Sequence, residues 1–279
     1  MMKRYYIQTK KDKKIKLLDA IKDNLNLSRE EAEKLIYQGS VWNSKRNVRL
    51  KDKNRLIQNE LICINKPEFP ILEYTLDINN IKYEDDDFII VYKEAGLNTC
   101  QTPLSDIDCL THGVQKYIID KKIDYSVSTI NRLDKPTKGL VFYAKNKKTE
   151  ITLHEMFKAR KIKKLYLCLT PQFKLEKESY IIKDQLEWKG KLSEAITYIK
   201  FLKDINRKYY FIVYPLTGRT HQIRKHFQKY LIPIYGDALY GDYSREDEME
   251  LICISYCFKH PYRGKRLNIE FIPDKYKCL

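Results

Sequence analysis

The stretch Asn131-Arg132-Leu133-Asp134-Lys135-Pro136-Thr137-Lys138-Gly139-Leu140 places one carboxylate between two basic side chains, directly ahead of an apolar run. Pro136 and Gly139 favour a fixed loop that leads into a buried strand. Nearby cations keep an aspartate ionised near neutral pH, and an ionised, oriented carboxylate can act as a nucleophile or a base. Taken alone, an aspartate beside a proline is more often an ordinary turn residue.

Apolar runs on both sides of this stretch predict strands joined by short turns. We expect strands at 88–92 and 140–144, a hairpin from 195–202 and 208–215 around the turn 203–207, and a late pair at 251–258 and 267–272. With the few helices between them, these strands predict an α+β domain with a mixed, largely antiparallel sheet and flanking helices.

A second polar stretch, residues 218–226, reads GRTHQIRKH and predicts the start of a helix. Ile223 and Phe227 begin its apolar face, and Arg224 on another face can project into a cleft. The first amides of such a helix favour anions. His221 and His226 are five residues apart and do not share a helix face, so they predict no metal pair.

The first 70 residues form a smaller and more basic unit, with 17 Lys/Arg against 9 Asp/Glu. The spacing of Leu17, Leu18, Ile21 and Leu25 predicts a helix. A capping box from Ser28 to Glu31 starts a second helix, and Gly39 ends it. Prolines near residues 66–70 indicate a linker, so we predict an N-terminal domain at 1–68 and a second domain at 69–279.

Composition limits the classes of function. The chain has 279 residues and a net charge of +16, which favours a polyanionic partner such as nucleic acid. No apolar run approaches the roughly 18 residues of a membrane span. Seven scattered cysteines, an odd number, predict reduced thiols and a cytoplasmic protein.

These two polar stretches, together with a third at residues 83–97, resemble the RluA-type pseudouridine synthases over residues 80–279. That family reads His-Arg-Leu-Asp-x-x-Thr-Ser-Gly-Leu where this chain has 131–140, and the run Gly218–Arg224 matches it without a change. Residues 234–241 look like the family's Gly-Asp-x-Leu-Tyr-Gly loop. Residues 15–64 resemble the RNA-binding module named after ribosomal protein S-four, which often precedes this catalytic domain.

The resemblance implies roles for single residues. Asp134 takes the position of the catalytic aspartate, Arg224 that of its arginine partner and Tyr166 that of the active-site tyrosine. Arg132 takes the position of the arginine that fills the space left by a flipped nucleotide. Further RNA contacts are expected at the basic and polar residues Arg29, Lys34, Lys45, Arg46, Arg49, Arg219, His221 and Gln222.

Three positions depart from the family pattern. Asn131 replaces the usual His and Lys138 the usual Ser, while Glu94 stands where Pro usually follows Lys93. Asn can hydrogen-bond but does not titrate near neutrality, and Lys138 is expected to add a cation near the path of the RNA.

No metal or cofactor is predicted. The acidic run Asp85–Asp87 is more often a solvated turn than a magnesium site. Cys253 and Cys257 with His260 lack the second cysteine pair of a zinc site. Isomerising uridine involves no redox step, and the chain has no P-loop or dinucleotide fingerprint.

The leading hypothesis is an RNA pseudouridine synthase acting as a monomer, most plausibly on large-subunit ribosomal RNA. Transfer RNA remains a second substrate class. An RNA-binding or ribosome-assembly protein with a relic active site is the alternative from another class, and the changes at Asn131 and Lys138 keep it open. The sequence also leaves open whether Asp134 attacks the anomeric carbon or removes the 2′ proton of the ribose.

Overall fold

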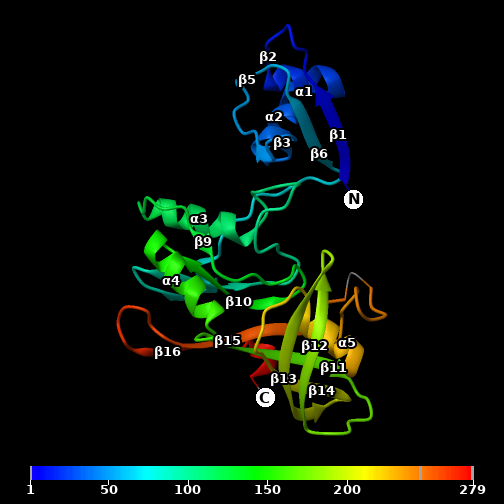
Figure 1. The fold of residues 1–279 in the computed structure, drawn as a ribbon, viewed down its shortest axis with the longest axis vertical. Helices are drawn as coiled ribbons and strands as arrows, with labels where there is room; N and C mark the ends of the chain where they lie inside the picture. Colours follow the sequence, from blue (N-terminus) through cyan, green and yellow to red (C-terminus); the bar gives the residue numbers. More distant parts are fainter. Residues whose placement is uncertain (1, 245–246, 278–279) are drawn as a thin grey trace. The chain divides into compact units, whose positions relative to one another are not determined.

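The computed structural model describes residues 2–244 and 247–277. The chain divides into two compact units (Figure 1). The first comprises the chain up to Leu76 together with Cys100–Tyr117, and the second comprises Asp77–Thr99 and the chain from Ile118 onward. Helix α3 (Leu110–Asp120) carries the chain from one unit into the other. The predicted boundary between residues 68 and 69 leaves Cys100–Tyr117 in the second domain, whereas the structure groups this segment with the first unit.

The first unit contains the two predicted helices, α1 (Leu17–Leu25) and α2 (Arg29–Tyr37). The capping box is confirmed: Glu31 N donates to Ser28 Oγ at 3.1 Å, and Ser28 N donates to Glu31 Oε2 at 2.8 Å. Gly39 follows α2 with φ +83°, a conformation that favours glycine. The apolar faces of both helices pack into one core with the strands beneath them.

Two small sheets complete the first unit. One has the order β1 (Met2–Gln8), β6 (Leu61–Pro67), β3 (Val41–Asn43) and β4 (Val48–Arg49), and the other pairs β2 (Ile15–Lys16) with β5 (Leu56–Ile57). The second segment of the unit is bonded to this framework. Trp42 Nε1 donates to Pro103 O at 2.8 Å, and Ser40 Oγ donates to Leu104 O at 2.6 Å.

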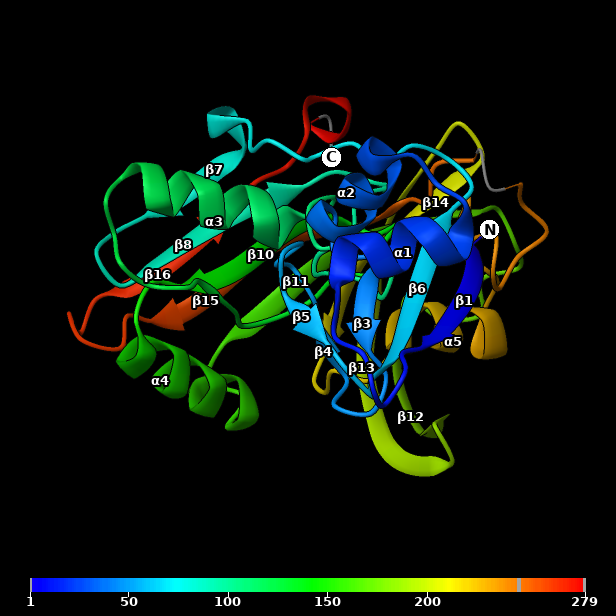
Figure 2. The ribbon, with the colours of Figure 1, turned by 90° about the horizontal axis from the view of Figure 1, so that it is seen from above.

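The second unit is built on a ten-stranded mixed sheet (Figure 2). Its main path is β12 (Ser179–Trp188), β13 (Lys191–Ile205), β14 (Lys208–Pro215), β11 (Lys163–Pro171), β15 (Leu251–Lys259), β10 (Lys138–Ala144), β8 (Phe88–Lys93) and β7 (Ile81–Glu84). Off this path, β9 (Ser128–Thr129) pairs with β10 and β16 (Arg266–Glu270) with β15. Within the described chain only β10 and β15 pair in parallel, which confirms the predicted sheet.

Two helices of the second unit lie beside the sheet: α4 (Lys147–Lys158) packs on β10, and α5 (Gln222–Tyr230) packs against β12, β13 and β14 (Figures 1 and 2). Short 3₁₀ turns occupy Ile78–Asn80 and Asp274–Tyr276. No helix within 2–244 and 247–277 has the length and apolarity needed to cross a membrane. The six described cysteines are free thiols, and Cys278 lies outside the described residues.

Candidate active site

Asp134 lies on the loop that enters β10, and residues 93–99 hold this loop on both sides. Leu133 N donates to Thr99 Oγ1 at 3.1 Å, and Thr99 Oγ1 donates to Leu133 O at 2.7 Å. Buried Lys93 donates from Nζ to Lys135 O at 3.1 Å and also to the carbonyls of Glu94 and Leu97. The backbone on either side of Asp134 is therefore fixed, while its carboxylate stays 28% exposed.

Gly139 explains why the loop can enter the sheet beside β15. Its φ is +119°, and an added Cβ would lie 2.3 Å from the carbonyl oxygen of Cys253. Only glycine allows the start of β10 to approach β15 this closely. The glycine that marks the strand entrance in the sequence thus brings the Asp134 loop against the centre of the sheet.

Arg224 projects from α5 to Asp134, as the resemblance implies. Its guanidinium is only 5% exposed, and Nη1 donates to Asp134 Oδ2 at 3.1 Å. The remaining nitrogens are also used: Nε and Nη2 each donate to Asp237 at 2.8 Å. Burial works against the charge of Arg224, but the two carboxylates outweigh it and raise the pKa of the guanidinium.

His221 lies at the other oxygen of Asp134. Its Nε2 is 3.7 Å from Asp134 Oδ1, and its Nδ1 is 2.9 Å from the hydroxyl of Tyr240. Burial lowers the pKa of His221 below its ordinary value, although the negative charge of Asp134 opposes this. His221, which was predicted to bind RNA, therefore lies in the network around Asp134, and its contact with RNA stays a prediction.

Tyr166 lies in the middle of β11. Leu167 and Leu169, two residues apart on this strand, belong with Ile252 to one buried apolar cluster. Tyr166 is buried, and it pairs with Cys253 of β15 in the sheet. Burial raises the pKa of Tyr166 far above its ordinary value.

Other predicted site residues of the second unit differ in exposure. Arg132 and Arg219 are exposed. Gln222 is buried, and its amide donates to Ile196 O and Thr197 Oγ1 while its oxygen accepts from Thr217 and the Arg219 amide. Gln222 thus ties the start of α5 to β13, and its contact with RNA stays a prediction.

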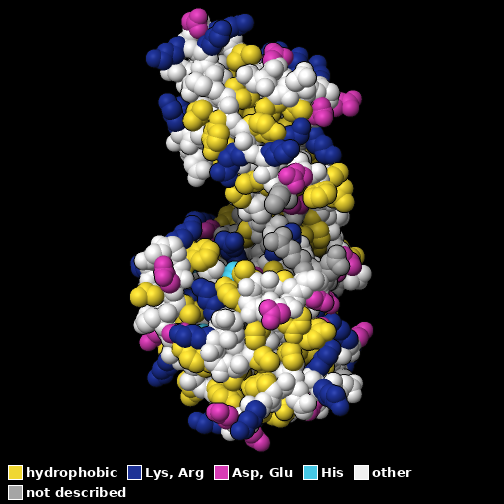
Figure 3. Space-filling model, turned by 90° about the vertical axis from the view of Figure 1, so that its right-hand side faces the viewer, with side chains coloured by type: hydrophobic (Ala, Val, Ile, Leu, Met, Phe, Trp, Pro, Cys, Tyr) yellow, Lys and Arg dark blue, Asp and Glu magenta, His cyan; other side chains and the backbone are white. Residues whose placement is uncertain are grey.

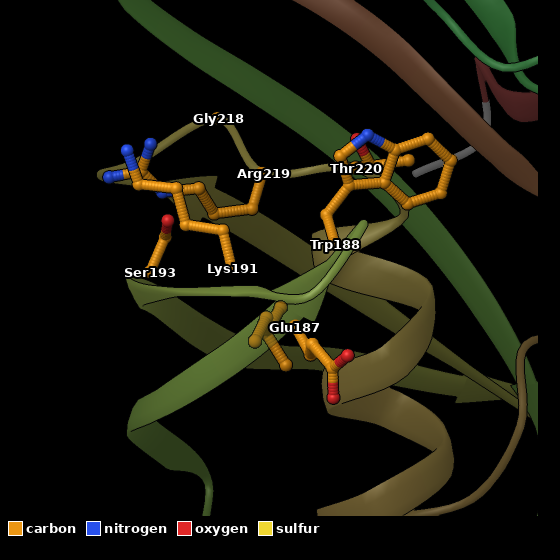
Figure 4. A pocket seen from close by; sticks show the side chains of 8 residues that line it. Glu187, Trp188, Lys191, Ser193, Gly218, Arg219 and Thr220 are labelled. Carbon is orange, nitrogen blue, oxygen red and sulfur yellow. The ribbon is translucent and has the colours of Figure 1, made fainter.

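A pocket of about 220 Å³ lies beside the start of α5 (Figure 4). Arg219 and Lys191 extend to one side of it, and the indole of Trp188 lies on the other side, near Thr220. Trp188 is 53% exposed at the tip of the β12–β13 hairpin. Trp188 was not among the predicted site residues, although an aromatic residue before the turn Lys189-Gly190 was a signal for an exposed ring at a hairpin tip.

The predicted RNA-binding cations of the first unit also divide. Lys34, Lys45 and Arg46 are exposed, and Arg29 is exposed but paired with Glu33 at 3.0 Å. Arg49 is instead engaged within its unit, donating to the carbonyls of Gly39, Thr102 and Ser105. On the face drawn in Figure 3, Lys and Arg side chains are spread among acidic and apolar ones.

Two departures from the family pattern have structural tasks. The Asn131 side-chain oxygen accepts from the Phe142 amide at 2.9 Å, which ties the loop to β10. Lys138 was expected near the RNA path, but it is buried and paired with Glu248 at 3.0 Å and Glu250 at 3.2 Å. Its charge is therefore balanced inside the unit.

Asp85, Asp87 and His260 form a group of possible metal ligands within 4.8 Å of one another. Asp85 already accepts from His260 Nε2 and from the Tyr83 hydroxyl, both at 2.8 Å, as well as from two backbone amides. These bonds close the turn before β8, so the structure gives the group a task without a metal.

Comparison with known proteins extends these findings. A family model described as RNA pseudouridylate synthase matches residues 87–229. The chain is 33% identical over 205 residues to a protein of Rickettsia bellii named ribosomal large subunit pseudouridine synthase C, covering 67% of this chain but only 66% of that relative. It is 29% identical over 274 residues to an uncharacterized RNA pseudouridine synthase of Mycoplasma pneumoniae, covering 90% of this chain and 86% of the relative.

A solved structure of an RNA pseudouridylate synthase domain protein has a similar fold. The solved structure of human RNA pseudouridylate synthase domain containing 4 superposes with a TM-score of 0.58 at 20% identity, over 71% of this chain and 90% of that one. The segment that the family model matches, residues 87–229, contains the Asp134 loop, Tyr166 and most of α5. The chain belongs to the RNA pseudouridylate synthase family.

Proposed function

We propose that the protein is an RNA pseudouridine synthase. One observation carries the proposal: within the segment that matches the family, a partly exposed carboxylate on a fixed loop is held by a buried guanidinium at 3.1 Å. Such a charge-assisted bond orients the carboxylate. The relic alternative predicts no reason to maintain this pair, so an active enzyme is the better reading.

The net reaction needs no redox change. The N1–C1′ bond of uridine breaks, the uracil turns, and a C5–C1′ bond forms, while a proton leaves C5 and another is taken up at N1. The uridine is first extruded from its stack into the site. Asp134 either attacks C1′ or removes the 2′ proton, and both routes need an ionised, oriented carboxylate.

Two further residues complete the proposed site. Tyr166 packs against the extruded base, a contact that aromatic side chains commonly make with unstacked bases. Arg132, exposed on the loop beside Asp134, fills the space that the base leaves. Large-subunit ribosomal RNA is the proposed substrate because relatives such as that of Rickettsia bellii are named for it. We propose a cytoplasmic monomer.

Asp134→Asn tests the proposal with little change of shape. The amide keeps an acceptor for Arg224 but loses the negative charge, so we expect activity to fall by about a thousandfold or more. Activity is measured as tritium released from RNA labelled at C5 of uridine, prepared from cells that lack the gene. Carbodiimide-dependent primer-extension stops then identify the modified RNA.

Asp86→Asn is the matched control, since the Asp86 side chain is 97% exposed. It should release tritium at the rate of the unchanged protein. Primer-extension stops confined to transfer RNA would mean that transfer RNA, and not ribosomal RNA, is the substrate. Wild-type activity in the Asp134→Asn variant would refute the proposed chemistry. RNA binding without tritium release by the unchanged protein would favour the RNA-binding alternative.

A further inference from the structure

A buried carboxylate on the loop after α5 shares the guanidinium of Arg224 with Asp134. The Asp237 side chain is fully buried, and it accepts Arg224 Nε at Oδ2 and Nη2 at Oδ1, each at 2.8 Å. This two-point contact fixes the plane of the guanidinium. Nη1 is then aimed at Asp134 Oδ2, 3.1 Å away.

The loop itself is rigidly placed. Asp237 Oδ1 also accepts the backbone amides of Leu239 at 3.1 Å and Tyr240 at 3.2 Å. Gly236 has φ +74°, and an added Cβ would lie 2.3 Å from Glu248 O, so the chain before Asp237 is in close contact with its neighbour. Tyr235 N donates to Leu169 O at 2.9 Å, which attaches the loop to β11.

The same loop reaches the other oxygen of Asp134 through a second pair. The ring of Tyr240 lies 5.0 Å from the Arg224 guanidinium carbon, and its hydroxyl is 2.9 Å from His221 Nδ1. His221 Nε2 in turn lies 3.7 Å from Asp134 Oδ1. The loop that carries Asp237 and Tyr240 thus contacts both neighbours of the Asp134 carboxylate, Arg224 at Oδ2 and His221 at Oδ1.

We propose that Asp237 and Tyr240 are positioning residues for Asp134, Asp237 acting through Arg224 and Tyr240 through His221. The inference rests on the proposed function and deepens it. A carboxylate attached to one fixed loop can still rotate about its side-chain bonds, and small misplacements of a reacting group are costly. Asp237 also balances the charge of Arg224, so the guanidinium can stay buried and oriented beside Asp134.

Asp237→Asn tests the first arm. Asparagine keeps an oxygen for the Leu239 and Tyr240 amides but removes the negative charge and one acceptor for Arg224. We expect kcat to fall about tenfold, with KM within about twofold of the unchanged protein.

Tyr240→Phe tests the second arm and serves if the first variant does not fold. It keeps the ring beside Arg224 but removes the hydroxyl from His221, so we expect a loss of about three- to tenfold in kcat and little change in KM. Tyr243→Phe is the matched control, because Tyr243 contacts the ring of Tyr235 and lies outside this network. It should retain full activity.

Two results would overturn the inference: an unchanged kcat in both variants, or a raised KM with an unchanged kcat, which indicates a merely structural role. A crystal structure of the full-length Asp237→Asn protein gives a readout independent of activity. We expect Arg224 Nη1 to move beyond hydrogen-bonding distance of Asp134, and an intact contact would also overturn the inference. Failure of the proposed function appears differently, as an unchanged protein that releases no tritium.

Discussion

His226 is fully buried on α5, and within the described chain neither ring nitrogen has a hydrogen-bond partner. Burial lowers its pKa from 6.5 to about 4, although the charge of Asp184 opposes the shift. Because the folded pKa lies below the unfolded one, the unfolded chain binds more protons between these values. We therefore expect the free energy of unfolding to fall as the pH drops from 6.5 toward 4, by up to about 3 kcal/mol.

The variant His226→Leu should remove most of this acid sensitivity, which urea unfolding at pH 7 and pH 5 measures. His154→Leu, at an exposed position of α4, is the matched control and should keep it. An equal loss of stability between the two pH values in the His226→Leu and unchanged proteins would show that His226 is not its source.

Replacement of Lys93, a second buried residue, is expected to lower the free energy of unfolding. Burial lowers its pKa to about 7, and its Nζ donates to three backbone carbonyls around the Asp134 loop. Lys93→Met leaves these carbonyls without a donor, so we expect the free energy of unfolding to fall by about 2–4 kcal/mol. Chemical denaturation measures it, and Lys135→Met, at an exposed neighbouring position, should cost far less.

The pairing of basic side chains far apart in sequence was harder to predict than the pairing of Asp134 with Arg224. Asp134 and Arg224 stand in recognisable motifs, and the structure brings them together. Arg49 and Lys138 have no local signal for their pairing, since Arg49 also bonds Thr102 and Lys138 pairs with Glu248, which lie more than 50 and 100 residues away in sequence. Asp237 had a motif but no predicted role, because its contact with Arg224 depends on how the loop folds back onto α5.

The strands of the second unit followed closely from the sequence, because alternation and turn residues are local signals. The expected hairpin at 195–202 and 208–215 is present as β13 and β14, with the turn where it was predicted. The parallel pairing of β10 with β15 joins residues more than 100 positions apart. No local pattern encodes such a pairing, and Gly139 gave the only sequence sign of the close approach.

Gly139→Ala tests how closely β10 and β15 depend on that approach. The new methyl would collide with the backbone of Cys253, so we expect a loss of about 3 kcal/mol or more in stability. Gly96→Ala is the matched control: its φ is also positive, at +78°, but nothing lies within 4 Å of the added Cβ. Thermal unfolding compares the two, and equal losses would attribute the whole effect to backbone strain.

Across the molecule, the excess of positive charge and the exposed cations of the first unit predict that this unit contributes to RNA affinity. We expect the double variant Lys45→Gln with Arg46→Gln to raise KM without changing kcat. A plot of the logarithm of the RNA-binding constant against the logarithm of salt concentration has a negative slope. Its magnitude should decrease by about 2, because two phosphate contacts are lost.

Filter binding at several salt concentrations measures that slope. Lys13→Gln with Lys14→Gln removes the same charge at exposed positions in the same unit and is the control. Equal effects of the two double variants would mean that only net charge matters, and that the loop at residues 45 and 46 has no specific contact with RNA.

The bonds from Ser40, Trp42 and Asn65 to the carbonyls of Pro103 and Leu104 have an evolutionary consequence. An appended module that folded from one uninterrupted segment could be gained or lost by simple gene fusion. In this chain Cys100–Tyr117 belongs to the first unit, although in sequence it lies between two segments of the second unit. Exchange of this unit between relatives therefore requires matching changes at two separate places in the gene, which favours joint inheritance of the two units over modular shuffling.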